Sequence, residues 1–167
     1  VEIYWVYRDF KDMMELTENI VTSIIDKMHG KYELPFGETT LNFTKPWRKL
    51  SMADSVKEIG GIDIFAHSVD ELRKLAHEHR IEDPDKPQSQ REYLIAFFEA
   101  LVEEKLIQPT FIYDYPVENS PLAKRHREKE GFTERFELFI AGMEVGNGFS
   151  ELNDPVDQKE RFEAQDE

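Results

Sequence analysis

The sequence predicts an α+β fold in which helices flank an antiparallel sheet. Segments rich in β-branched and aromatic residues lie at the start, in the middle and near the end of the chain, in residues 1–10, 40–52, 108–116 and 135–151. Helical periodicities separate them, without the regular strand–helix alternation that builds a parallel sheet. The 167 residues, of which 40% are hydrophobic and 12% aromatic, fit one domain with a substantial core.

Composition also limits the classes of function. The chain contains no cysteine, which excludes disulfides, thiolate zinc sites and cysteine nucleophiles and fits a reducing cytoplasm. No apolar run approaches the roughly 18 to 20 residues of a membrane helix, and no signal peptide precedes the fold, so we expect a soluble protein without membrane contact. The formal net charge of −14 disfavours binding of nucleic acid or anionic lipid by this segment as a whole.

The chain opens with a predicted strand, VEIYWVYRDF, in which Glu2 and Tyr4 share one face. An alternating strand with one solvated face has the same pattern, so this pair does not by itself indicate a site. An amphipathic helix follows, because apolar residues recur every three or four positions from Phe10 to Met28. Asp9 suits the N-terminal cap of this helix, and Gly30 suits its end.

A loop with Pro35 is expected after the first helix. Residues 40–52 then predict an extended strand or a hairpin. A short helix, capped by Ser51 or Asp54, is expected to end near Gly60.

The pattern becomes helical over residues 62–107. It predicts helices at 69–80 and 90–106, separated by a polar break, and we interpret this region as a helical insertion. Residues 108–116 predict a further strand and 117–134 a polar loop. A last helix is expected to begin near Pro155, with Asp154 as its cap.

Carboxylates are concentrated in the predicted hairpin RFELFIAGMEVGNGFSELNDP, where Glu137, Glu144 and Glu151 recur every seven residues. A tight turn at Ala141-Gly142 with Ile140 paired to Met143, or Phe139 to Gly142, places Glu137 and Glu144 directly or diagonally opposite on one face. Two close carboxylates repel unless a cation lies between them, and oxygen ligands suit Mg²⁺ with substrate phosphates. A half-solvated hairpin with outward-facing acids fits the same spacing.

The second strand of this hairpin carries a further group of side chains. Asn147, Phe149 and Glu151 alternate along it and therefore share a face. By strict alternation this is the face opposite to Glu144. A bulge at the glycine-rich GNG would reset the phase and bring all of them to one face.

Three blocks of sequence resemble the catalytic domain of class II lysyl-tRNA synthetases of the bacterial type. They are VEIYWVYRDFKDMMELTE, LNFTKPWRKLSMADSVKE and the long stretch from PTFIYDYP to NDPVDQKERFEAQ, in the order that the family has them. The resemblance covers essentially the whole chain. It implies a partial catalytic domain in residues 1–167, lying between motif 2 and motif 3, with residues 62–107 as a helical insertion.

The resemblance also assigns roles to individual residues. It implies that Glu137 and Glu144 hold the Mg²⁺ ions that bridge the phosphates of ATP. A lysine ammonium has three donors and is strongly hydrated, so its pocket needs a carboxylate and neutral acceptors, with an aromatic ring over the aliphatic stem. The residues implied in this lysine pocket are Glu2, Tyr4, Asn147, Phe149 and Glu151.

The activity implied is that of an ATP-dependent lysine–tRNA ligase of protein biosynthesis, which forms lysyl-adenylate and transfers lysine to tRNA(Lys). The family acts as a homodimer, and its motif 1, motif 3 and the arginines of motif 2 are not found in this sequence. We therefore expect the isolated segment to be inactive. Two alternatives remain open: the related ligase that lysylates elongation factor P, which largely lacks a helical insertion, and a non-catalytic module whose acidic surface binds a basic partner.

Overall fold

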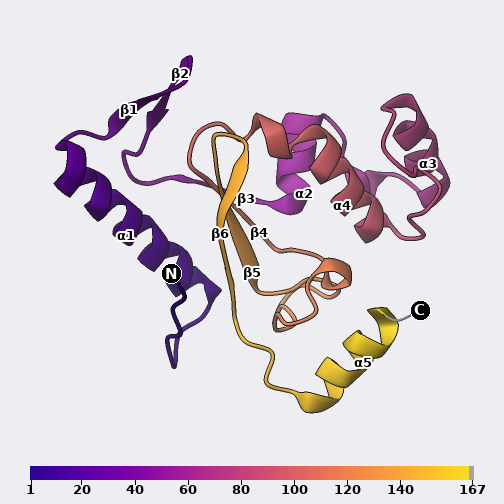
Figure 1. Cartoon of the computed structure of the whole chain (residues 1–167). Coiled ribbons are helices and arrows are strands. Elements are labelled where there is room, and N and C mark those ends of the chain that lie inside the picture. The colour runs from indigo at the N-terminus through magenta and orange to yellow at the C-terminus, as the bar shows by residue number, and fades with distance from the viewer. Residues whose placement is uncertain (166–167) are drawn as a thin grey trace.

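The computed structural model describes residues 1–165 and confirms the α+β class (Figure 1). The helices are α1 (Phe10–His29), α2 (Met52–Ser55), α3 (Val69–Glu78), α4 (Gln90–Leu101) and α5 (Pro155–Gln165). The strands are β1 (Glu33–Phe36), β2 (Thr39–Asn42), β3 (Arg48–Ser51), β4 (Thr110–Tyr113), β5 (Arg135–Ile140) and β6 (Met143–Phe149). Short helical turns lie at Val56–Gly60, Ile64–Ala66, Glu103–Lys105 and Val117–Asn119.

Helix α1 begins and ends at the predicted residues. The Asp9 side chain accepts hydrogen bonds from the backbone of Lys11 and Asp12, and the Asp12 carboxylate accepts one from the Asp9 backbone, which completes a capping box. Gly30 ends the helix in the left-handed conformation, with φ of 62°. The capping residues therefore fix both ends of the helix, as the sequence predicts.

The predicted N-terminal strand is wrong for this chain. Residues 1–9 pair with no strand, and a turn forms at Val6 and Tyr7 instead. Tyr4 is 78% exposed and Tyr7 is fully exposed. β-propensity does not hold a segment extended when no neighbouring strand accepts its backbone hydrogen bonds, and residues 1–165 supply none to this segment.

The expectation of a loop at Pro35 is also wrong, because β1 and β2 form a two-stranded hairpin that joins Phe36 to Thr39 across Gly37. Strand β3 then joins a separate four-stranded sheet of order β3-β4-β5-β6. The β4–β5 and β5–β6 pairs are antiparallel, whereas β3 runs parallel to β4. The main sheet is therefore mixed rather than wholly antiparallel.

The two faces of the main sheet contribute to different cores. Phe111, Phe136 and Leu138 pack with α1, and we name this side the α1 face. Ile112 and Phe139 pack with α2 and α4 on the other side, the α4 face. Figure 1 shows α1 and α4 on opposite sides of the strands. Since strand residues alternate, Glu137 falls on the α4 face between its apolar neighbours.

The helices after β3 follow the predicted order. Ser51 caps α2, Ser68 caps α3 and Ser89 caps α4. Helix α4 ends at Leu101, earlier than the predicted residue 106, and a short helical turn continues the chain. No helix that the structure describes is long and apolar enough to cross a membrane.

Helix α5 is attached to the loop that precedes β5. Asp154 caps it by accepting hydrogen bonds from the backbone of Val156 and Asp157, as predicted. The Arg161 guanidinium is buried and donates to the carbonyl oxygens of Ser120 and Ala123 at 2.9 and 2.7 Å. These bonds hold the C-terminal helix against the loop that leads into the site.

Candidate functional site

The β5–β6 hairpin is closed by the predicted turn. Ala141 and Gly142 both adopt left-handed backbone conformations, with φ of 56° and 73°, as the tight turns of hairpins require. Their backbone N–H groups donate to the carbonyl oxygens of Ile107 and Leu106 at 2.8 and 3.0 Å. A Cβ on Gly142 would lie 3.0 Å from the Glu104 carbonyl oxygen, so glycine permits this close contact with the end of the α4 region.

A β-bulge in β6 brings the predicted side chains to one face. The pairing passes from Leu138–Gly146 to Phe139–Glu144, which leaves Val145 as the additional residue. The bulge lies one residue before the GNG sequence, where the sequence leaves a bulge open, and it resets the alternation. In this register Asn147 is paired with Glu137, so Glu137, Glu144 and Asn147 share the α4 face.

A cavity of about 280 Å³ lies between the hairpin and α4. Apolar side chains of α2 and α4 form part of its wall. Its ionisable side chains are four glutamates, one arginine and one tyrosine: Glu99, Glu103, Glu137, Glu144, Arg135 and Tyr115. The cavity is thus strongly acidic, with carboxylates from both the sheet and the helix.

Glu137 is the buried carboxylate of this cavity, with 8% of its surface exposed. Its Oε2 accepts a hydrogen bond from the Tyr115 hydroxyl at 2.6 Å, and its Oε1 accepts one from Arg135 Nη2 at 2.5 Å. Burial raises the pKa of Glu137, although the Tyr115 bond and the Arg135 charge act in the opposite direction. The charge of Glu144 adds to the rise.

Glu144 lines the same cavity but differs from Glu137 because it is exposed. Its Oε1 accepts a hydrogen bond from Asn147 Nδ2 at 3.0 Å. Among residues 1–165, no group of three or more histidine, aspartate or glutamate side chains is arranged to hold a metal ion. Glu137 and Glu144 fit a divalent cation whose remaining oxygen ligands come from phosphate or water, which is the donor set that Mg²⁺ commonly takes.

Sequence reasoning found the two sheet carboxylates but missed the other ionisable residues of the cavity. Arg135 lies two residues before Glu137 on the same strand, so alternation alone places both on one face. Glu99 lies on α4, and Glu103, four residues later, lies in the short helical turn that follows it. Tyr115 lies beyond the end of β4, and no periodicity in the sequence indicates its contact with Glu137.

The residues predicted for a lysine pocket come from two places. Phe149 is half-buried at the end of β6, and Glu151 is exposed and forms an isolated β-bridge with Ala123. Glu2 and Tyr4 lie in the exposed N-terminal segment, where the Tyr4 hydroxyl donates to Glu2 Oε1 at 2.6 Å. This bond raises the pKa of Tyr4, and the charge of Glu151 makes a smaller contribution in the same direction.

Comparison with known proteins decides the family. The family model for tRNA synthetases class II (D, K and N) matches residues 1–167. The chain belongs to this family. It is 58% identical over 166 residues to lysine–tRNA ligase 2 of Methanosarcina mazei. The aligned region covers 99% of this chain and 32% of that protein.

Other lysine–tRNA ligases agree with this class II synthetase assignment. The chain is 61% identical over 167 residues to that of Methanospirillum hungatei, and 49% identical over 166 residues to that of Listeria monocytogenes. These matches cover 100% and 99% of the chain and 33% of each relative. The class II synthetase chain thus spans about a third of the length of the relatives it matches.

Proposed function

We propose that the protein containing this class II synthetase chain is a lysine–tRNA ligase, which activates lysine with ATP and transfers it to tRNA(Lys). The observation that carries the proposal is the placement of Glu137 and Glu144 on one face of the β5–β6 hairpin, lining one cavity. The relatives at 58% and 61% identity, both named lysine–tRNA ligase, support the choice of amino acid.

Glu137 and Glu144 would hold Mg²⁺ in this proposal. When bound, the ion supplies positive charge to the phosphate oxygens of ATP. The chain's own contribution is geometric: the pairing of Phe139 with Glu144 puts both carboxylates on the α4 face, and the bulge at Val145 adds Asn147 to that face. The Ala141-Gly142 turn is fixed to the backbone after α4. Positioning of this kind lowers the entropic cost of bringing reacting groups together.

Five residues would bind lysine. Glu151 supplies the counter-charge for the side-chain ammonium, and the Tyr4 hydroxyl supplies a neutral acceptor. Phe149 covers the aliphatic stem, and Asn147 donates to the substrate carboxylate. Glu2, whose carboxylate accepts a hydrogen bond from the Tyr4 hydroxyl at 2.6 Å, lies beside the α-amino group. The exposure of Tyr4 and Glu151 leaves both free to contact a substrate.

The wider organisation belongs to the same proposal. Residues 62–107, which contain α3 and α4, form the helical insertion of a catalytic domain that this chain represents in part. The complete protein acts as a homodimer in the cytoplasm. Arginines supplied by its other segments act on ATP, so we expect the isolated 167-residue chain not to charge tRNA.

The test uses the complete protein. Lysine-dependent ATP–pyrophosphate exchange should be measured beside the exchange supported by arginine and ornithine, and charging of tRNA(Lys) should follow. We expect exchange with lysine alone and charging of tRNA(Lys). Absence of lysine-dependent exchange contradicts the proposal, and transfer of lysine to elongation factor P in place of tRNA assigns the protein to the related protein ligase. Charging by the 167-residue chain at the rate of the complete protein contradicts the expected inactivity.

A further inference from the structure

Both oxygens of the Glu137 carboxylate are bound by side chains of this chain. Tyr115 donates to Oε2 at 2.6 Å, and Arg135 donates to Oε1 at 2.5 Å. Hydrogen bonds to an ionised carboxylate are among the stronger hydrogen bonds in proteins. Two donors on different oxygens prevent the carboxylate from rotating about its terminal bond, so its orientation is fixed.

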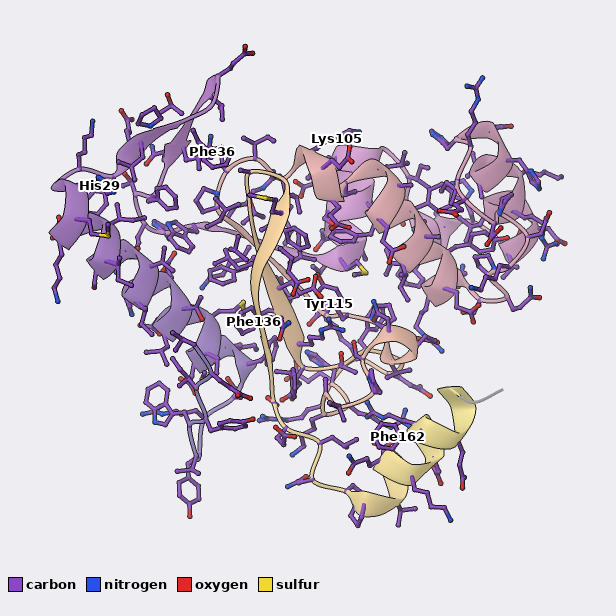
Figure 2. The ribbon with its side chains drawn as sticks, in the orientation of Figure 1. His29, Phe36, Lys105, Tyr115, Phe136 and Phe162 are labelled. Atoms are coloured by element: carbon purple, nitrogen blue, oxygen red, sulfur yellow. The ribbon has the colours of Figure 1, made fainter. Side chains whose placement is uncertain are left out.

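The two donors are themselves held in place. Arg135 Nη1 donates to the Asn119 carbonyl oxygen at 2.6 Å and to Ser120 Oγ at 3.0 Å. The Arg135 guanidinium carbon lies 4.7 Å from the centre of the Tyr115 ring. Tyr115 is 2% exposed, and its ring packs in the core on the α4 face (Figure 2). Glu137 is therefore oriented by a network that joins the residues after β4 to β5.

The arrangement differs from that of an ordinary buried ion pair. Arg135 is the single cationic side chain that lines the cavity within residues 1–165, where it faces four carboxylates. If all four are ionised, the cavity keeps a net charge of −3, so Arg135 does not neutralise it. Each carboxylate oxygen has two lone-pair directions, and a single accepted hydrogen bond leaves one direction free on each oxygen of Glu137.

We propose that Tyr115 and Arg135 are positioning residues of the divalent-cation site, which hold the Glu137 carboxylate in the one orientation that lets it bind an ion together with Glu144. This inference rests on the proposed function and adds two residues to it. Groups that bind the ligands of a metal ion commonly matter almost as much as the ligands, since their removal typically weakens metal affinity by about 10- to 100-fold.

The decisive variant is Tyr115→Phe in the complete protein, because it removes one hydrogen bond without changing charge or ring volume. Binding of Mn²⁺ should be measured by electron paramagnetic resonance with a non-hydrolysable ATP analogue present. We expect the Mn²⁺ Kd to rise about tenfold. The Mg²⁺ concentration for half-maximal lysine-dependent exchange should rise in parallel, while kcat at saturating Mg²⁺ stays within about twofold of wild type.

Two further variants complete the design. Tyr113→Phe changes another tyrosine near the same strand end, whose hydroxyl makes no bond to Glu137, and it should leave the Mn²⁺ Kd unchanged. Arg135→Lys keeps the positive charge but removes the planar guanidinium, which donates to Glu137 and to the Asn119 carbonyl oxygen at the same time. It should therefore also weaken Mn²⁺ binding. If Tyr115→Phe fails to fold, as judged by circular dichroism, Arg135→Lys gives the answer.

A rise in Mn²⁺ Kd of less than about threefold in the folded variants overturns the inference. The wild-type protein separates this failure from failure of the proposed function. Wild-type protein that shows no lysine-dependent exchange contradicts the function. Active wild-type protein beside variants with unchanged Mn²⁺ affinity contradicts only the role of Tyr115 and Arg135.

Discussion

Two segments carry the residues assigned to lysine, and they are built in different ways. The β5–β6 hairpin is paired along its length, closed by a left-handed turn and fixed to the backbone after α4. Residues 1–8 form no strand pairing with any other part of residues 1–165, and Tyr4 and Tyr7 are exposed to solvent. One segment is positioned before any substrate arrives, whereas the side-chain contacts of the other are local: the Tyr4–Glu2 hydrogen bond, the Arg8–Asp12 ion pair and the Arg8 guanidinium over the Trp5 ring.

The difference shows where positioning comes from in this chain. A strand gains its precision from neighbours that satisfy its backbone groups, and both neighbours of β5 lie within residues 1–165. Residues 1–8 have the composition of a strand, but no strand within residues 1–165 pairs with them. We therefore expect substitutions in the hairpin to change both stability and function, and substitutions in residues 1–8 to leave the stability of this chain almost unchanged.

The largest effect is expected from Glu151→Gln in the complete protein. A bound lysine ammonium would lose its counter-charge at a cost of about 2 to 5 kcal/mol, or roughly 30- to 5,000-fold in kcat/KM for lysine. The KM for ATP should change little. Glu160→Gln, on the exposed side of α5, is the matched control and should leave both constants unchanged. An unaltered kcat/KM for lysine in Glu151→Gln would remove this residue from the pocket.

The next effect concerns the stability of the hairpin. A Cβ on Gly148 would lie 2.7 Å from the Phe136 ring, whereas a Cβ on Gly146 would meet nothing within 4 Å. Gly148→Ala should therefore lower the free energy of unfolding by about 1 to 3 kcal/mol, since it overpacks a tight contact. Gly146→Ala should stay within about 0.5 kcal/mol of wild type. Urea denaturation of the 167-residue chain measures the free energy of unfolding of both variants. Equal losses of stability would contradict the view that the tight contact between Gly148 and the Phe136 ring causes the effect.

Helix ends and turns could be predicted from the sequence, whereas the position of the bulge and the contacts between distant residues could not. Local chemistry predicts the α1 boundaries at Asp9 and Gly30 and the Ala141-Gly142 turn, because each depends on residues a few positions apart. The bulge falls at Val145, and alternation alone does not choose between this position and the glycines after it. The Tyr115–Glu137 contact joins residues 22 apart through the β4–β5 pairing, so it follows from tertiary structure alone.

A smaller effect is expected at the cavity wall. Burial, followed by the charges of Glu99 and Glu144, raises the pKa of Glu103 above its usual 4.5. The folded chain therefore holds this proton more tightly than the unfolded chain, and the resulting stability is present below pH 4.5 and lost as pH rises through the folded pKa.

Glu103→Gln should accordingly stabilise the chain at pH 8 and lose this advantage at pH 4. The gain should not exceed about 1 kcal/mol, because solvent screens a partly exposed carboxylate. Thermal unfolding at the two pH values measures it. Glu38→Gln, in the exposed turn between β1 and β2, is the control and should show no comparable gain. A loss of stability at pH 8 in Glu103→Gln would mean that the carboxylate makes favourable contacts that outweigh its burial.

The smallest effect is expected at Tyr4, where the comparison between the two segments is sharpest. Within residues 1–165 its hydroxyl bonds only to Glu2, two residues earlier in the sequence, and both side chains are exposed. Tyr4→Phe should therefore change the free energy of unfolding of this chain by no more than about 0.5 kcal/mol. In the complete protein the same substitution should raise the KM for lysine, because a neutral acceptor for the ammonium is lost. Urea denaturation and lysine-dependent exchange measure the two effects separately. A loss of stability as large as that of Gly148→Ala would mean that residues 1–8 are packed into the fold, and the contrast between the two segments would fail.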